Sequence, residues 1–381
     1  KKIVLYGEGW NFGEVADNKR GKNATQLNLS GTGIGSFNDR LRDAVRGGNP
    51  FDDRRLQGFA TGLFTSPSSY QTGLLPADGQ RAKLLEQTDW IRLGLAGNLT
   101  RFKITRADDA VKTGEQVLYN GQQAAYAGLP RENIVYVSAH DNETLFDKVQ
   151  FAAPANAALA DRIRMNNLAT DIVMLSQGLP FFHAGDDILR SKSMDGNSYN
   201  SGDWFNAIDW TYADNGWGHG LPLAGGNKDR WDVVRPLLAN TALKPSQAQV
   251  IAARDHFLDM LRIRKSSPLF RLTTADDVLA RVSFLNEGSK QVPGLIVMSL
   301  ADDGALDPNY ARILVFFNAN PGALSWSNPQ LPNGWKLHPI LAASADPALK
   351  QAGAAGASFS TAPTPICCGR MATTARSMIC S

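Results

Sequence analysis

Residues 133–142 read NIVYVSAHDN, a short apolar run that ends in polar, chemically versatile side chains. A short continuous apolar run is the pattern of a strand buried on both faces of a parallel sheet. An acid at the carboxyl end of such a strand is where parallel α/β barrels place catalytic groups. The stretch therefore predicts an α/β fold with its chemistry at the strand ends, at His140 and Asp141.

A second apolar run, Ile3–Tyr6, is followed by Gly7, Glu8 and Trp10. It predicts another strand buried on both faces, again with an acid at its carboxyl end. Glycosidases need a pair of carboxyls flanking the bond that they cut. Glu8 and Asp141, each beside a residue able to contact a sugar, therefore point to carbohydrate chemistry.

The rest of the chain alternates in the same way until about residue 275. A brief strand is expected at 36–39 and another at 179–182, and helical spacing predicts helices over 40–46, 83–95, 159–175 and 246–265. This alternation is typical of βα units. Beyond it, β-rich segments at 278–285, 294–300 and 312–318 predict a small antiparallel β domain.

Composition excludes several classes of partner. The charged fraction is 20%, and Lys+Arg 39 against Asp+Glu 36 gives a net charge of only +3, with both signs interspersed. We therefore expect no nucleic-acid partner and no anionic membrane surface. No apolar run reaches the roughly 18 residues of a membrane helix.

The cysteines lie only at the carboxyl end, at Cys367, Cys368 and Cys380. Residues 366–381 lack the alternation of the preceding chain. We interpret them as an atypical tail, disordered or artefactual, in preference to a metal or redox site.

Three candidates carry alternatives. Glu8 fits a proton donor, since partial burial beside an aromatic such as Trp10 raises a carboxyl pKa, but it also fits a loop hydrogen bond. His140 and Asp141 can contact sugar hydroxyls, although Asp141 equally fits a cap of the next turn. The polar, aromatic segment 190–206 suits a carbohydrate cleft wall and also an ordinary surface loop.

Taken together, these segments resemble the debranching enzymes of the α-amylase family, of the pullulanase and limit-dextrinase type. The resemblance covers about residues 1–360. Its specific pieces are the motif at Tyr6–Trp10, the stretches 25–28 and 31–40, the motif at Val137–Asn142, and the loop 191–206.

The resemblance implies a role for each candidate. Glu8 would be the general acid/base on the fifth barrel strand, and Asp141, helped by His140, would bind and distort the reacting sugar on the seventh. Trp10 would stack near the leaving group. The acceptor side would hold Phe51 and Arg81, and the donor side would hold Asp195, Asn197 and Asp229.

One part of the family pattern is absent. In this family the nucleophile is an Asp in a Gly-x-Arg-x-Asp segment, and this sequence has no such segment. The nearest mimic, Thr105–Asp108, follows no apolar strand. We therefore expect residues 1–272 to be the second half of a (β/α)8 TIM-type barrel, strands five to eight. A small antiparallel β-sandwich domain is expected over 273–365. The missing N-terminal half would be this chain's partner.

The expected function is retaining hydrolysis of α-1,6 branch linkages in pullulan, amylopectin or limit dextrins, with this chain inactive alone. A non-catalytic α-glucan-binding fragment and a related α-1,4 hydrolase or transglycosylase stay open. No cofactor is required, and calcium is compatible with the resemblance without an identifiable site. A secreted or cell-surface bacterial location is preferred to a cytoplasmic or plastid one.

Overall fold

The structure, a computed structural model, describes residues 3–302, 304–322, 324, 326–331, 335–345 and 366–369, the last four by their backbone alone. Its centre is a four-stranded parallel sheet in the order β1-β2-β7-β8. The strands are β1 (Tyr6–Gly7), β2 (Gly35–Phe37), β7 (Asn133–Val135) and β8 (Leu179–Pro180). Each pairs in parallel with its neighbour, so all four carboxyl ends meet at one edge. The α/β class is thus as expected.

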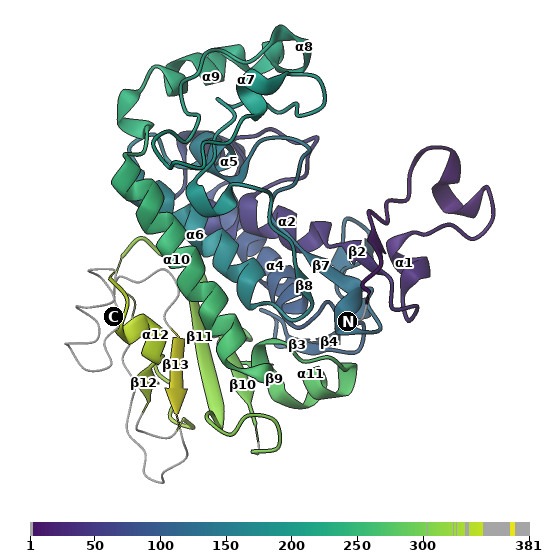
Figure 1. Cartoon of the computed structure of the whole chain (residues 1–381). Helices are drawn as coiled ribbons and strands as arrows, with labels where there is room; N and C mark the ends of the chain where they lie inside the picture. Colours follow the sequence, from purple (N-terminus) through teal and green to yellow (C-terminus); the bar gives the residue numbers. More distant parts are fainter. Residues whose placement is uncertain are drawn as a thin grey trace.

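The predicted first strand is only partly right. Tyr6 and Gly7 pair with β2, but Ile3 and Leu5 lie 88% and 60% exposed instead of buried on both faces. The reason is position, because β1 is the edge strand and the sheet is open there. The connection from β1 to β2 forms an arm that carries the 3-10 helix η1 (Gly13–Asn18) and α1 (Gln26–Leu29) away from the body (Figure 1).

The helices expected from periodicity are all present: those at 159–175 and 246–265 have nearly the expected bounds, and those at 40–46 and 83–95 begin earlier than expected. They begin where the caps allow: the Asn38 side chain accepts a hydrogen bond from the backbone N–H of Leu41, and the chain leaves the helix at Gly47 with φ of 96°. In the parallel-sheet region the helices are α2 (Asp39–Arg46), α3 (Ser69–Leu74), α4 (Ala77–Leu95), α5 (Leu145–Ala152), α6 (Leu159–Leu175), α7 (Asp203–Asn206), α8 (Ala224–Asn227), α9 (Trp231–Leu238) and α10 (Gln247–Ser266). Helix α2 packs on α4, and α6 packs on α10.

Two small hairpins separate α4 from β7, and the sequence did not indicate them. They pair β3 (Lys103–Thr105) with β4 (Val111–Thr113) and β5 (Leu118–Tyr119) with β6 (Gln122–Gln123). The segment around Thr105–Asp108 therefore belongs to a hairpin, away from the parallel sheet.

The carboxyl-terminal part is an antiparallel five-stranded sheet in the order β12-β13-β11-β10-β9. Its strands are β9 (Val282–Phe284), β10 (Leu295–Ala301), β11 (Arg312–Asn318), β12 (Lys336–Leu337) and β13 (Ile366–Gly369). Residues 278–281, expected in a strand, instead end helix α11 (Ala275–Arg281), because Thr274 caps that helix by accepting from Asp277 N–H. The short helix α12 (Pro339–Ala342) follows β12.

The small antiparallel β domain expected at the carboxyl end is present, and its described strands belong to one five-stranded sheet. One face of the five-stranded sheet joins the main core through Ile296, Met298 and Val315, and the other packs on loop side chains including Trp326 and Trp335. Figure 1 shows α10 running between the sheet and the helical part. The main core continues across residue 272, where the sequence predicts a domain boundary.

The expectation of an unstructured tail from residue 366 is wrong for its first four residues. Strand β13 pairs antiparallel with both β11 and β12, because its backbone fills the gap between them. Cys380 and the rest of residues 370–381 lie outside the described residues.

Candidate functional site

The site is built at the edge where the carboxyl ends of the four parallel strands meet. Glu8 follows β1, His140 and Asp141 follow β7, and His183 and Asp186 follow β8. Because parallel neighbours end at the same edge, segments far apart in sequence share this rim. The pairings thus put both predicted carboxylates, Glu8 and Asp141, on the same edge.

Glu8 differs from the expected environment. It is exposed instead of partly buried, and Trp10 is half-buried beside it. Between them, Gly9 has φ of 76°, and a Cβ there would lie 2.7 Å from the Cβ of Ser36. Only glycine allows this close turn over β2. The exposure follows from the edge position of β1.

Beneath the rim, aromatic side chains from all four strands or their ends line one face of the sheet. Phe37 contacts Tyr136 and Phe181 at ring-centroid distances of 4.9 and 5.0 Å, and Tyr6 lies 6.0 Å from Phe37. All three pairs are edge-to-face. Tyr6 remains 52% exposed, so this aromatic face opens to solvent at the β1 side.

The segment 138–143 that carries His140 and Asp141 is fixed at both ends. Ser138 Oγ lies 2.8 Å from each carboxylate oxygen of Asp186. At the other end, buried Glu143 accepts a hydrogen bond of 2.8 Å from Arg54 Nε, and Arg230 Nη1 lies 3.4 Å away. His140 and Asp141 themselves form an exposed pair at 3.4 Å.

Burial perturbs the titration of the groups behind the rim. It raises the pKa of Asp186 to about 7, against the opposing effect of the Ser138 hydrogen bond. Burial also lowers the pKa of His183 to about 4, helped by the positive charge of Arg190. Neutral His183 suits its contact with Arg190, whose Nη1 lies 3.2 Å from the ring Nε2.

The loop residues expected on the donor side have different environments. Asp195 is fully buried, and its Oδ1 accepts from Asn227 Nδ2 and from Asn197 N–H, so in this chain it organises the loop instead of facing a cleft. Asn197 is half-buried and accepts from Tyr199 N–H at 2.9 Å. Asp229 is exposed.

Phe51 and Asp229, expected on opposite sides of the scissile bond, line the same cavity of about 400 Å³. Arg54 and Arg230, the partners of Glu143, line it as well. Phe51 is 98% exposed at its mouth. Arg81, by contrast, is an exposed residue of α4 and does not line this cavity.

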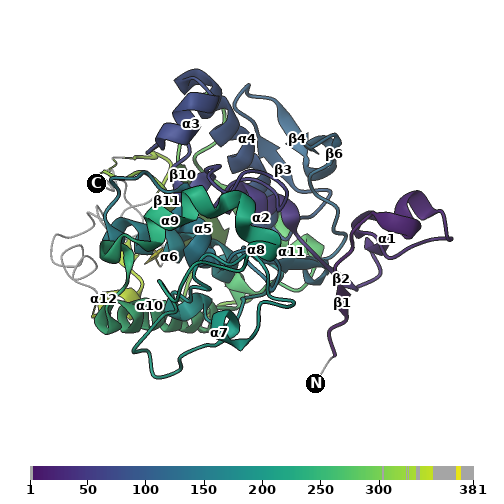
Figure 2. The ribbon, with the colours of Figure 1, turned by 90° about the horizontal axis from the view of Figure 1, so that it is seen from above.

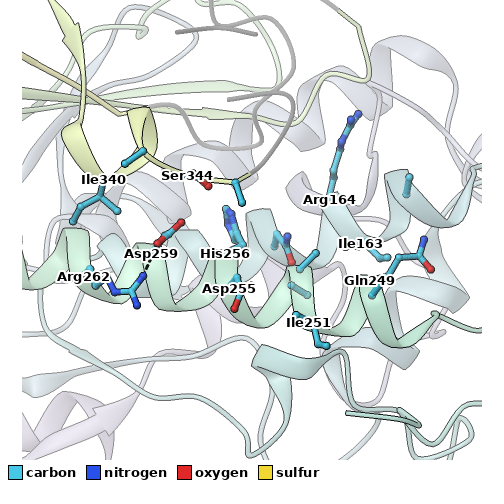
Figure 3. Close-up of a pocket in the computed structure, with 17 residues that line it drawn as sticks. Ile163, Arg164, Gln249, Ile251, Asp255, His256, Asp259, Arg262, Ile340 and Ser344 are labelled. Carbon is cyan, nitrogen blue, oxygen red and sulfur yellow. Dashed lines mark hydrogen bonds and ion pairs between the residues drawn. The ribbon is translucent and has the colours of Figure 1, made fainter. Parts of the chain in front are cut away.

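A larger cavity of about 730 Å³ lies between α6, α10 and α12 (Figure 3). The Nε2 atom of His256 on its wall lies 2.9 Å from a carboxylate oxygen of Asp171 on α6. The cavity contains none of the residues predicted for sugar binding.

The residues that sequence reasoning missed are those that hold the rim from behind: Ser138, Glu143, Asp186, Arg54 and Arg230. Asp186 follows the apolar strand at 179–182, so the strand-end rule that found Asp141 was able to find it too. The arginines carry no such signal, because neither follows an apolar strand: Arg54 lies in a turn and Arg230 ends a short 3-10 helix.

Over the described ranges, no group of three or more His, Cys, Asp and Glu side chains is arranged to hold a metal ion. The helices there are likewise all too short or too polar to span a bilayer.

Comparison with known proteins agrees with this architecture. A sequence family described as "Alpha-1,6-glucosidases, pullulanase-type, C-terminal" matches residues 212–366. Pullulanase 1, chloroplastic, from Arabidopsis thaliana is 48% identical over 92% of this chain and 37% of its own length. Pullulanase from Klebsiella pneumoniae is 40% identical over 84% of this chain and 29% of its own length.

Solved structures agree. PulA from Klebsiella oxytoca superimposes with a TM-score of 0.85 at 34% identity, covering 96% of this chain and 35% of that one. The maltotriose complex of PulA from Klebsiella pneumoniae gives the same TM-score and identity, covering 100% of this chain and 40% of that one. The chain spans about a third of the length of these two curated pullulanases.

The Arabidopsis relative corrects one expectation. A protein named as chloroplastic is 48% identical to this chain, so ranking a plastid location below a secreted bacterial one is wrong. The family expected from the sequence motifs is confirmed: the chain belongs to the pullulanase family and corresponds to its C-terminal portion.

Proposed function

We propose that this chain supplies the C-terminal part of the active site of an enzyme that hydrolyses α-1,6 linkages in α-glucans such as pullulan. The observation that carries the proposal is the shared strand edge, where Glu8 after β1 and Asp141 after β7 lie on one parallel sheet. The kinship with pullulanases supports the substrate class.

Each rim residue has a chemical task in this proposal. Glu8 donates a proton to the oxygen that links two glucose units and later takes a proton from water. Asp141 and His140 hold hydroxyls of the reacting sugar, and Asp141 offsets positive charge at its anomeric carbon. Trp10 provides a face on which the leaving sugar stacks.

The nucleophile comes from a preceding part of the longer protein. A retaining glycosidase needs its nucleophile about 5–5.5 Å from the acid/base, and this sequence has no Gly-x-Arg-x-Asp segment. Exposure of Val4 (48%) and Leu5 (60%) and of the aromatic face beside Tyr6 fits a sheet that continues past β1. The strands that continue it would be the first half of the (β/α)8 barrel.

The test joins this chain to the N-terminal portion of Arabidopsis pullulanase and compares the fusion with the chain alone on pullulan. We expect maltotriose from the fusion and no turnover from the chain. Glu8→Gln in the fusion should lower kcat by about 100- to 10,000-fold, the usual contribution of a general acid/base. A fully active Gln variant would remove Glu8 from its role, and panose-type products would indicate α-1,4 cleavage instead.

Binding without turnover is the second candidate, because Trp10, His140 and Asp141 are present here without a nucleophile. Maltotriose titration of the isolated chain, with Trp10→Ala as the variant, separates the two. Saturable binding by the chain together with an inactive fusion would favour an α-glucan-binding protein.

A further inference from the structure

Within the part of the chain that the structure describes, the side chains of His140 and Asp141 form an ion pair only with each other. They touch each other at 3.4 Å, and their side chains are 74% and 76% exposed. Asn142, which follows them, has φ of 65°, so the backbone turns sharply directly after Asp141. Their direction is therefore set by the backbone on either side.

Asp186 is the group that fixes the strand side of this segment. Ser138 is completely buried, and its Oγ lies 2.8 Å from both Oδ1 and Oδ2 of Asp186. Asp186 is 5% exposed and also accepts from His183 N–H at 3.1 Å. The carboxylate thus ties the end of β7 to the turn that follows β8.

We infer that Asp186 is a positioning residue, which through its hydrogen bond with Ser138 aims His140 and Asp141 at the bound sugar. The inference rests on the proposed function and adds a residue that touches neither sugar nor water in the reaction. Its burial behind the rim separates it from the groups that do.

The charges around Asp186 make its role dependent on pH. In the same turn, the charge of Asp187 raises the pKa of Asp186 and that of Arg190 lowers it. Arg254 on α10 lowers the pKa of Asp187. The charge of His140 lowers the pKa of the neighbouring His183. Burial dominates and raises the pKa of Asp186 to about 7, so its ionised form is costly in the folded chain.

The raised pKa of Asp186 predicts how the stability of an Asp186→Asn variant depends on pH. Because the folded pKa lies above the ordinary value, the carboxyl group favours the fold fully at low pH and loses that contribution as pH rises through about 7. Asp186→Asn does not titrate. Its stability relative to the unsubstituted chain should therefore improve from pH 4 to pH 8, although its effect on the rim persists at pH 8.

The primary test follows the His140 side chain by NMR in the isotope-labelled chain at pH 8. Ser138→Ala and Asp186→Asn should each shift the His140 resonances, and Ser138→Thr, which keeps the hydroxyl, should restore them. The matched control is Asp307→Asn, another buried Asp that accepts from a serine, Ser267 Oγ at 2.5 Å, in the C-terminal region. Unmoved His140 resonances in Asp186→Asn would overturn the inference.

The second test uses the fusion with the Arabidopsis N-terminal portion. Asp186→Asn and Ser138→Ala should each lower kcat on pullulan about 10-fold with KM within about 2-fold, as for one lost hydrogen bond. The double variant should lose no more than either single one, since both remove the same interaction. Additive losses would contradict the inference. A fusion without any activity would contradict the proposed function but not the role of Asp186, because the NMR shifts of His140 test that role separately.

Discussion

Glu143 is a carboxylate buried where three loops meet, with Arg54 on one side and Arg230 on the other. Arg54 also donates to Asn142 Oδ1 at 3.0 Å, so it holds the segment directly after Asp141. A buried ion pair is weak evidence for the stability of a protein as a whole, but removing one of its partners leaves the other charge poorly compensated in the interior. These contacts of Arg54 and Arg230 fix segments that are distant in sequence to the rim.

Removing one partner of this buried pair should be costly. Arg54→Met removes the closer of the two arginines paired with buried Glu143, and we expect a loss of about 3–5 kcal/mol in the free energy of unfolding. Arg101→Met breaks an ion pair with Asp276 that is largely exposed, and should cost about 0–1 kcal/mol. Urea denaturation of both variants measures the difference. Equal losses would mean that Arg54 does not compensate Glu143.

His183 should make the chain sensitive to acid. Burial lowers its pKa to about 4, below the ordinary 6.5, so the folded chain keeps the ring neutral. Its contribution to stability is present above pH 6.5 and is lost as pH falls toward 4. His183→Gln keeps an acceptor for Arg190 and does not titrate.

The free energy of unfolding of His183→Gln should therefore depend less on pH between 6.5 and 4 than that of the unsubstituted chain, as measured by urea denaturation at each pH. His338→Gln offers a comparison outside the rim, because burial lowers the pKa of His338 to about 4 as well. A variant with the same acid sensitivity as the parent would show that His183 protonates freely in the fold.

At the scale of elements, helix ends explain why the predicted helices have the bounds they do. Helix α10 begins with a capping box, in which the Ser246 side chain accepts from Gln249 N–H and the Gln249 side chain accepts from Ser246 N–H. Helix α6 begins at Leu159, and its N-cap residue Ala158 provides no side-chain cap. The two helices pack against each other, so each affects the same core.

Changes at these two caps should have opposite signs. Ser246→Ala removes the cap and should lower the free energy of unfolding by about 1 kcal/mol, and Ala158→Ser should raise it by a similar amount. Thermal unfolding followed by circular dichroism compares the two with the parent chain. A destabilising Ala158→Ser would show that its backbone geometry does not permit capping.

For the whole molecule, the open side of the parallel sheet dominates the surface. In Figures 1 and 2 the arm with η1 and α1 stands away from the body on the β1 side, and exposed apolar residues accompany it, including Ile3, Leu5 and Phe12. An exposed, apolar edge strand is a template for pairing with another chain. The β1 edge of the parallel sheet is therefore an exposed apolar surface.

This open edge should promote self-association of the isolated chain. Leu5→Lys places a charge beside β1 and should reduce the associated fraction in sedimentation velocity at a given concentration. Val111→Lys, at a similarly exposed position (61%) on the β3–β4 hairpin, is the control and should change little. In the fusion protein, Leu5→Lys should instead destabilise, because there the edge is expected to be covered. No effect in either setting would argue against a continuing sheet.

The sequence by itself determined the features that depend on neighbouring residues. Apolar periodicity located α6 and α10 closely, because the spacing of their apolar residues is a local property of the sequence. The acids at the ends of apolar runs located Glu8 and Asp141 at one edge, because parallel strands share their carboxyl ends. The motifs around them identified the pullulanase family.

Only the tertiary structure decided which groups stand behind that edge and which face water. The tie between Ser138 and Asp186, and that between Glu143 and Arg54, join loops distant in sequence, so no local pattern encodes them. The burial of Asp195 and the exposure of Glu8 likewise depend on how loops pack and where the sheet ends. Strand β13 was missed for the same reason, since its place is set by the gap between β11 and β12 and not by its own sequence.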